Sequence, residues 1–231
     1  MNKLTKTMLG IMIVGVVFII ATAAKSYSVW TKTPEDIETK AVSAYNVGDL
    51  ADGNVQYVID EVATLETYDK TLGIKHNKKN TPFYLIEVQD GYVIYQSRND
   101  SKNKTLAAMS DDTYEYFTYL ENVSNNVEVT SVPALPQKFA VTTYAEEMPD
   151  DLREIVYDYF LEAGYSNAEC DQLVANCVLK DINYKNTQYI PLIGIAMIIF
   201  PLLIIIIVKI NQRSKFKKWQ QNQMNNEPYN M

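Results

Sequence analysis

Two long apolar runs lie near the ends of the chain, and the residues between them mix polar and apolar positions. Residues 190–208 and residues 8–24 contain no charged side chain. As helices rising about 1.5 Å per residue, these runs would be roughly 28 Å and 25 Å long, close to the ~30 Å of a bilayer's hydrocarbon core. A lone segment in hydrocarbon must satisfy its own backbone hydrogen bonds and is therefore helical. The pattern predicts two transmembrane helices.

The first run also has the features of a secretory signal peptide. Lys3 and Lys6 precede it, and Ala21-Thr22-Ala23 has the form of a cleavage site. Its apolar length exceeds the ~7–15 residues of a signal-peptide core, which favours an uncleaved membrane anchor. A cleaved signal is the alternative.

A cationic cluster follows the second run. Segments rich in Lys and Arg stay on the cytoplasmic side of a membrane. We therefore expect a two-pass protein of the plasma membrane, with both termini cytoplasmic and the central part outside. The same cluster is a candidate site for anionic lipid headgroups. Its members are Lys209, Arg213, Lys215, Lys217 and Lys218. The Gln- and Asn-rich residues after it have little to bury, so the end of the chain is expected to be disordered.

The clearest local signal between the two runs is a β-hairpin at residues 82–98. Asp90-Gly91 separates two groups of strand-forming residues, which predicts a type I′ turn. That turn would place Val88 opposite Val93 on the neighbouring strand. Alternating or β-branched sequences predict the other strands, at residues 54–68, 127–132 and 139–144.

Helix signals and polar stretches interrupt the strands. Thr33-Pro34 opens a short helix that we expect to reach residue 44, and Ser110 caps another at residues 111–121. Polar composition predicts loops at two places. These are residues 73–81, with the only histidine, His76, and residues 99–104.

Apolar residues at helical spacing return after Pro149. A first helix is expected to end at Gly164, where glycine is a common stop. Ser166 and Glu169 then form a capping box that starts a second helix. The two predict a helical hairpin that leads into the second apolar run.

Together these elements predict an α+β membrane protein. Two transmembrane helices would flank a small OB-like barrel or α+β sheet domain that is followed by the helical hairpin. The expected segments are a cytoplasmic N-terminus (1–7), a first span (8–24), an extracytoplasmic domain (25–145), the helical hairpin (146–189), a second span (190–208) and a cytoplasmic tail (209–231).

The charge of the chain is unevenly distributed. The whole chain carries −7. The two ends, residues 1–7 and 209–231, hold seven cations against Glu227, a balance of +6, so the residues between them hold −13. Nucleic-acid binding needs a basic face, which such an acidic central part does not offer.

Few residues support catalysis or metal binding. Nucleophilic catalysis usually needs a histidine base, and His76 lies among lysines. Cys170 and Cys177 give no zinc ligand set with it. On one helix they would also lie about 10 Å apart, too far for a disulfide, so we expect both in the core. Glycines form no phosphate loop, and no cofactor is expected. Adjacent acids leave an envelope hydrolase open, at Asp111-Asp112, Glu146-Glu147 and Asp150-Asp151.

The layout resembles that of uncharacterised bacterial two-span membrane proteins of unknown function with one small extracytoplasmic domain. A basic start, an apolar run, the strand section TPFYLIEVQDGYVIYQSR, a helical pair and an apolar end carry this resemblance. The resemblance implies a topology and assigns no functional residue.

We expect a non-enzymatic accessory protein of the membrane whose outer domain binds an envelope protein or a ligand. One alternative is a sensor that passes a signal from this domain to the basic tail, and another is the carboxylate hydrolase. Exposed tyrosines on the hairpin and on the following helix are the candidate partner surface. They are Tyr84, Tyr92, Tyr95, Tyr114, Tyr116 and Tyr119.

Overall fold

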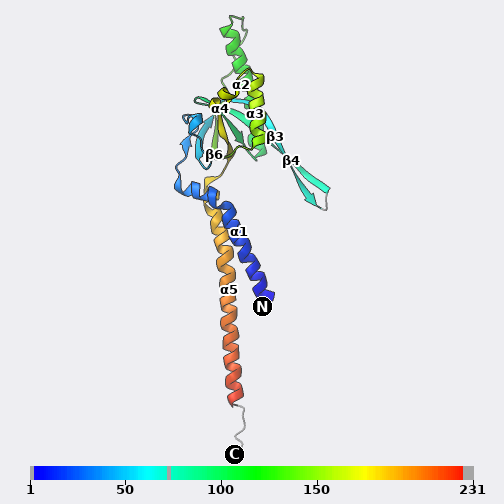
Figure 1. Cartoon of the computed structure of the whole chain (residues 1–231), viewed down its shortest axis with the longest axis vertical. Helices are drawn as coiled ribbons and strands as arrows, with labels where there is room; N and C mark the ends of the chain where they lie inside the picture. The colour runs from blue at the N-terminus through cyan, green and yellow to red at the C-terminus, as the bar shows by residue number, and fades with distance from the viewer. Residues whose placement is uncertain (1–2, 72–73, 226–231) are drawn as a thin grey trace, which may run out of the picture. The chain divides into compact units, whose positions relative to one another are not determined.

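The computed structural model describes residues 3–71 and 74–225. For residues 68–71, 74–77 and 222–225 it describes the backbone alone. The helices and strands are α1 (Lys3–Thr31), β1 (Glu35–Asp36), the 3-10 helix η1 (Val42–Ala44), β2 (Leu50–Val55), β3 (Val58–Thr71), β4 (Ile74–Val88), β5 (Gly91–Gln96), α2 (Asp100–Ser124), β6 (Phe139–Glu147), α3 (Asp150–Glu162), α4 (Asn167–Leu173), β7 (Val174–Asp181) and α5 (Tyr184–Asn225) (Figure 1).

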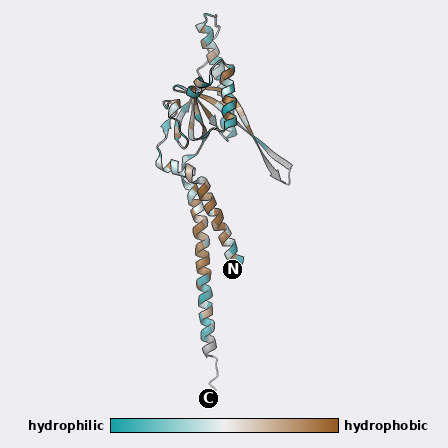
Figure 2. Cartoon of the chain, in the orientation of Figure 1, coloured by the Kyte–Doolittle hydropathy of each residue, from teal (hydrophilic) through white to brown (hydrophobic). Residues whose placement is uncertain are grey.

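The chain divides into two compact units. One is Ser28–Tyr184, and the other combines the two ends, Met1–Tyr27 and Lys185–Met231. The end unit contains α1 up to Tyr27 and α5 from Lys185 onward, and both helices are long and apolar enough to cross a membrane. Figure 2 shows apolar residues along most of α1 and along the first half of α5, whereas the second half of α5 is polar.

Both terminal helices are longer than the apolar runs that predict them. Residues 25–31 continue α1, and residues 209–225 continue α5. The disorder expected for the Gln- and Asn-rich residues after the cationic cluster is therefore wrong for residues 220–225, and residues 226–231 lie outside the described part of the chain. Lys, Arg and Gln are good helix formers, and adding residues to an existing helix avoids the cost of nucleation.

The central unit is built on one mixed sheet of seven strands. Their order across the sheet is β1-β2-β6-β7-β5-β4-β3. The pairs β1–β2 and β5–β7 are parallel, and the other neighbours are antiparallel. The outer strands β1 and β3 do not pair with each other, so the sheet stays open. Of the two predicted forms, the α+β sheet is confirmed and the OB-like barrel is wrong.

The sheet buries apolar residues on both faces. On one face α2 contributes Leu106 and Met109, and the segment around η1 contributes Ile37 and Val42. On the other face α3 and α4 cover a second cluster that includes Phe160 and Cys170. Two separate cores explain why the inner strands are apolar on both sides, a pattern typical of strands covered by helices on each face.

The predicted hairpin forms between β4 and β5, with a different turn. Val88 pairs with Gly91, and Ile86 pairs with Val93. The turn residues are therefore Gln89-Asp90, and neither has a positive φ. The type I′ turn and the pairing of Val88 with Val93 are wrong, because the register is shifted by two residues. A two-residue shift keeps every side chain on its expected face.

The first predicted helix and one predicted strand do not form. Glu35 and Asp36 pair with Ala51 and Asp52, which replaces the helix expected to reach residue 44. Local capping signals are weaker than this strand pairing and the burial of the residues that follow. Residues 127–132 form no strand, since no neighbouring strand pairs with them.

The structure also corrects both predicted loops. Residues 99–104 contain the start of α2, which Asn99 caps by accepting hydrogen bonds from the N–H groups of Ser101 and Lys102. Ser101 and Lys104 face solvent, whereas Lys102 and Asn103 are half-buried and hydrogen-bond to Asp181 and Ser97. Residues 74–81 belong to β4 and pair with the outer half of β3, so that the two strands extend as a ribbon beyond the other strands (Figure 1). His76 is part of this ribbon, and its side chain is outside the described residues.

Only the first part of the predicted helical hairpin is confirmed. Its first helix is α3, followed by Gly164 with a φ of +94°, and Ser166 and Glu169 form the predicted capping box of α4. After Leu173, however, the chain becomes β7, which lies between β5 and β6. A strand buried on both faces is continuously apolar, so its sequence is easily taken for a buried helix. The predicted strand at residues 139–144 is confirmed as part of β6.

Candidate functional site

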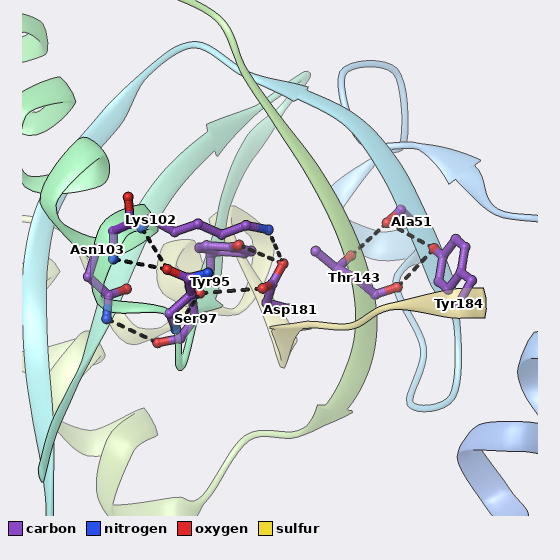
Figure 3. A network of polar contacts seen from close by, with 10 residues as sticks. Ala51, Tyr95, Ser97, Lys102, Asn103, Thr143, Asp181 and Tyr184 are labelled. Carbon is purple, nitrogen blue, oxygen red and sulfur yellow. Dashed lines mark hydrogen bonds and ion pairs between the residues drawn. The ribbon is translucent and has the colours of Figure 1, made fainter. Parts of the chain in front are cut away.

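A network of polar contacts fastens the beginning of α2 to the sheet (Figure 3). The carboxylate of Asp181, at the end of β7, accepts hydrogen bonds from Lys102 at 2.6 Å, from the Tyr95 hydroxyl at 3.3 Å and from Ser97 at 3.4 Å. The Asn103 side chain donates to the Ser97 carbonyl oxygen at 3.2 Å. These contacts tie the first turns of α2 to the end of β7 and to Ser97, the residue after β5.

Further hydrogen bonds join the middle of α2 to the edge strand β3. The Thr113 hydroxyl accepts from the Val58 N–H at 3.3 Å, and Ser110 donates to the Ile59 carbonyl at 3.2 Å. Thr113 is buried, whereas Tyr114 in the next position is 75% exposed. The helix is thus fixed on one side and presents its other side to solvent.

A groove of about 460 Å³ lies where α2, the start of β3 and α3 meet. Three carboxylates and three aromatic rings account for most of its chemistry. They are Asp60, Asp111, Glu121, Tyr114, Phe117 and Tyr159. None of the described residues that line it is Lys or Arg. We call it the α2 groove.

Neighbouring rings extend this aromatic surface. The Tyr57 ring centroid lies 5.3 Å from that of Phe117 and 6.3 Å from that of Tyr116, and both pairs are stacked. Burial and then the charge of Asp60 raise the pKa of Tyr159. Burial, followed by Tyr116 and Glu87, raises the pKa of Tyr57. The groove therefore combines aromatic faces with a negative field.

Aromatic faces and carboxylates favour one class of ligand. A cation over a ring is attracted by the negative face of the π-system, and a carboxylate nearby adds an ion pair. The three carboxylates are solvent-exposed. The groove therefore offers a cationic ligand both ring faces and carboxylates.

The predicted tyrosine surface is divided by the structure. Tyr114 lines the α2 groove, and Tyr116 and Tyr119 lie partly buried on the same helix. Tyr84 and Tyr95 are 2% and 0% exposed and belong to the core, so they are not available to a partner. The hairpin that carries them is an inner part of the sheet, which its tyrosine content does not reveal. Tyr92 is partly buried, with its ring 5.2 Å from that of Phe160.

The other predicted sites are not part of this groove. The cationic residues of the lipid site are exposed along the end of α5. Of the paired acids, Asp111 alone lines the groove, while Glu146 forms an ion pair with Lys180 at 2.7 Å. Sequence reasoning missed Asp60 and Tyr159, which reach the groove from β3 and α3. The only local sequence signal for the α2 groove is the spacing of the apolar and aromatic residues at positions 114–120.

A family model described as a domain of unknown function, DUF8577, matches residues 1–212. The chain belongs to this family. The matched residues include α1, the sheet unit and most of α5, so the DUF8577 model covers both terminal helices as well as the sheet. The match agrees with the expected resemblance to a family of unknown function. A search of the curated proteins found no match.

Proposed function

We propose that this DUF8577 chain is a membrane-anchored binding protein without catalytic activity. Its sheet unit, held outside the plasma membrane, binds a cationic segment of an envelope protein through the α2 groove. The observation that carries the proposal is the groove itself, with three carboxylates, three aromatic rings and no Lys or Arg among its described lining residues.

The anchoring part of the proposal rests on the two terminal helices. Each contains an apolar stretch long enough to span a bilayer. The cations after residue 208 favour a cytoplasmic location for both termini. Protease added to intact cells should cut the sheet unit and leave the C-terminal tail uncut; the reverse pattern would invert the topology.

The binding part rests on α2. Residues 106–124 contain four acids and no cation. Tyr114, Phe117 and Leu120 expose 75%, 36% and 43% of their surfaces. An exposed apolar patch bordered by one sign of charge is typical of an interaction surface, and complementary charge speeds the encounter with a partner.

In vivo photocrosslinking tests this interface. A benzophenone amino acid replaces Tyr114, and the matched control replaces Tyr165, which is 40% exposed and lies outside the groove. We expect a specific adduct from position 114, mapped by mass spectrometry to a Lys- or Arg-rich segment of the partner. A variant that combines Asp60→Asn, Asp111→Asn and Glu121→Gln should lose the adduct from position 114.

A matched neutralisation separates charge from location. Asp112→Asn, Glu115→Gln and Asp158→Asn remove three exposed acids that do not line the groove. This variant should keep the adduct. Equal adducts from positions 114 and 165, or an adduct that survives neutralisation of the groove, would contradict the proposal.

One observation favours the sensor alternative. The hydroxyl of Tyr184, the first residue of α5, donates to the carbonyl oxygens of Ala51 at 3.3 Å and Thr143 at 3.2 Å (Figure 3). These bonds hold the first residue of α5 against the sheet. If the protein is a sensor, Tyr184→Phe should change the crosslinked adducts formed by the basic tail, while the Tyr114 adduct persists. Tail adducts identical to those of the wild type would exclude this alternative.

A further inference from the structure

A second pocket lies on the sheet face that α3 covers. Its volume is about 210 Å³, and its walls come from β3, β4, β5, β7 and the first turns of α3. Phe83, Leu152 and Val178 form buried apolar walls, with Leu65 and Ile155 at 47% and 46% exposure. We call it the α3 pocket. It shares no lining residue with the α2 groove.

Gln96 is the unusual residue of this pocket. It lies at the end of β5, pairs through its backbone with Phe83 and Lys180, and is only 4% exposed. Its neighbour Tyr95 belongs to the core on the opposite face, so the Gln96 side chain points to the α3 side. Within the described residues, its amide forms no hydrogen bond. The amide is not one of the fully enclosed polar atoms that lack a partner, so it is open to a hydrogen-bonding group that enters the pocket.

The charged residues of the pocket favour an anion. Arg98 follows Gln96 on the same side of the chain, and its exposed guanidinium forms no ion pair with a described residue. Lys180 is already paired with Glu146 at 2.7 Å. Asp151 is exposed, and its carboxylate accepts from the Leu152 N–H at 3.0 Å. Arg98 is therefore the one cation left for a ligand, which suits a single negative charge.

The helix that borders the pocket leaves this preference to Arg98. The first turn of α3 carries the positive end of the helix dipole, but Asp150 and Asp151 lie in the same turn and offset it. A carboxylate can accept two hydrogen bonds from a guanidinium and one from an amide. The apolar walls then suit a short hydrocarbon tail.

We propose that the α3 pocket binds a small monocarboxylate with a short alkyl or aryl tail. Arg98 and the Gln96 amide hold the carboxylate, and the tail packs between Phe83, Leu152 and Val178. This site is independent of the α2 groove and gives the sheet unit a small-molecule ligand in addition to its macromolecular partner.

Equilibrium dialysis of radiolabelled hexanoate tests the proposal. The full chain is placed in lipid nanodiscs, and empty nanodiscs measure partitioning into lipid. We expect saturable binding above that baseline. Unlabelled hexanoate should compete at least about tenfold better than hexanamide, which lacks the charge, because charged hydrogen bonds are the stronger ones.

Three variants locate the binding. Arg98→Met should weaken hexanoate binding by about tenfold or more, and Gln96→Met, which keeps the volume of the side chain, by several-fold. Lys104→Met removes an exposed cation outside the pocket and should leave binding unchanged. Thermal melting of each variant confirms that it is folded.

Other outcomes would overturn the site. Binding no greater than that of empty nanodiscs would mean a water-filled pocket only. Affinity unchanged in Arg98→Met, or equal competition by hexanamide, would exclude the carboxylate. The Tyr114 adduct is expected to be the same in all three variants, so failure here is distinguishable from failure of the proposed interface.

Discussion

Gly15 of α1 and Gly194 of α5 lie against each other. A Cβ atom added to Gly15 would stand 2.9 Å from the Gly194 carbonyl oxygen, and one added to Gly194 would stand 3.0 Å from the Gly15 carbonyl oxygen. The Ser26 hydroxyl donates to the Thr187 carbonyl at 3.0 Å and links the same two helices. Small residues that let backbones approach closely, with polar bonds between helices, are typical of helix packing in membranes.

Substituting Gly15 should weaken this helix pair. In Gly15→Leu the side chain meets backbone atoms that cannot move aside, so we expect a loss of about 1–3 kcal/mol and a lower melting temperature. Gly10→Leu is the matched control, since nothing lies within 4 Å of a Cβ there. Thermal unfolding of both variants in the same detergent measures the difference. Equal melting temperatures would show that the glycine contact does not hold α1 to α5.

The ion pair between Asp49 and Lys40 should make the sheet unit sensitive to acid. Lys40 has a side chain only 2% exposed and contacts Asp49 at 2.7 Å. Burial raises the pKa of Asp49, but hydrogen bonds from Lys40, Lys32 and the Asn46 N–H outweigh it and lower the pKa to about 2. Because the pKa of Asp49 in the folded protein is below the ordinary aspartate value of 3.8, this stabilisation is present above about pH 4 and is lost as the pH falls towards 2.

Urea unfolding at several pH values checks this prediction. Stability of the wild type should fall by an amount on the order of 2 kcal/mol between pH 4 and pH 2 through this group. Asp49→Asn should be less stable at pH 7 and should lack that part of the acid dependence. Asp158→Asn, which removes an exposed acid, serves as the control. If Asp49→Asn loses as much stability between pH 4 and pH 2 as the wild type, the loss belongs to other carboxylates.

Removing the Asp181 carboxylate should loosen the start of α2. The change leaves the Tyr95 and Ser97 hydroxyls without their acceptor and Lys102 without its ion pair. We expect Asp181→Ala to cost about 1–3 kcal/mol and to speed amide hydrogen exchange in the first turns of α2. Glu115→Ala, on the exposed face of α2, is the comparison. Unchanged exchange in Asp181→Ala would mean that other contacts fix the helix.

Both cysteines should be free and unreactive in the folded protein. Cys170 belongs to the core beneath α4, and Cys177 to the core on the opposite face of the sheet. Burial raises the pKa of Cys177 to about 12, which suppresses its thiolate. Maleimide should label neither residue until urea is added, whereas an added Ser124→Cys at an exposed position should react at once. Rapid native labelling of Cys170 or Cys177 would contradict the buried positions.

The sequence by itself predicts elements whose signals are local. The apolar runs lead to α1 and α5, Pro149 and Gly164 bracket α3, and Ser166 with Glu169 starts α4. The hairpin of β4 and β5 is likewise predicted from adjacent residues. In each case the deciding side chains lie within a few positions of one another. The physical reason is that caps, turns and helical periodicity are short-range interactions.

Only the tertiary structure decides the elements that depend on distant partners. β7 is a strand because β5 and β6 pair with it on either side, and β1 replaces a capped helix because β2 offers a partner. The α2 groove combines Asp60, Tyr114 and Tyr159 from three elements, and the α3 pocket combines Gln96 and Arg98 with α3. Strand pairing and side-chain burial join residues far apart in sequence, so no local pattern contains them.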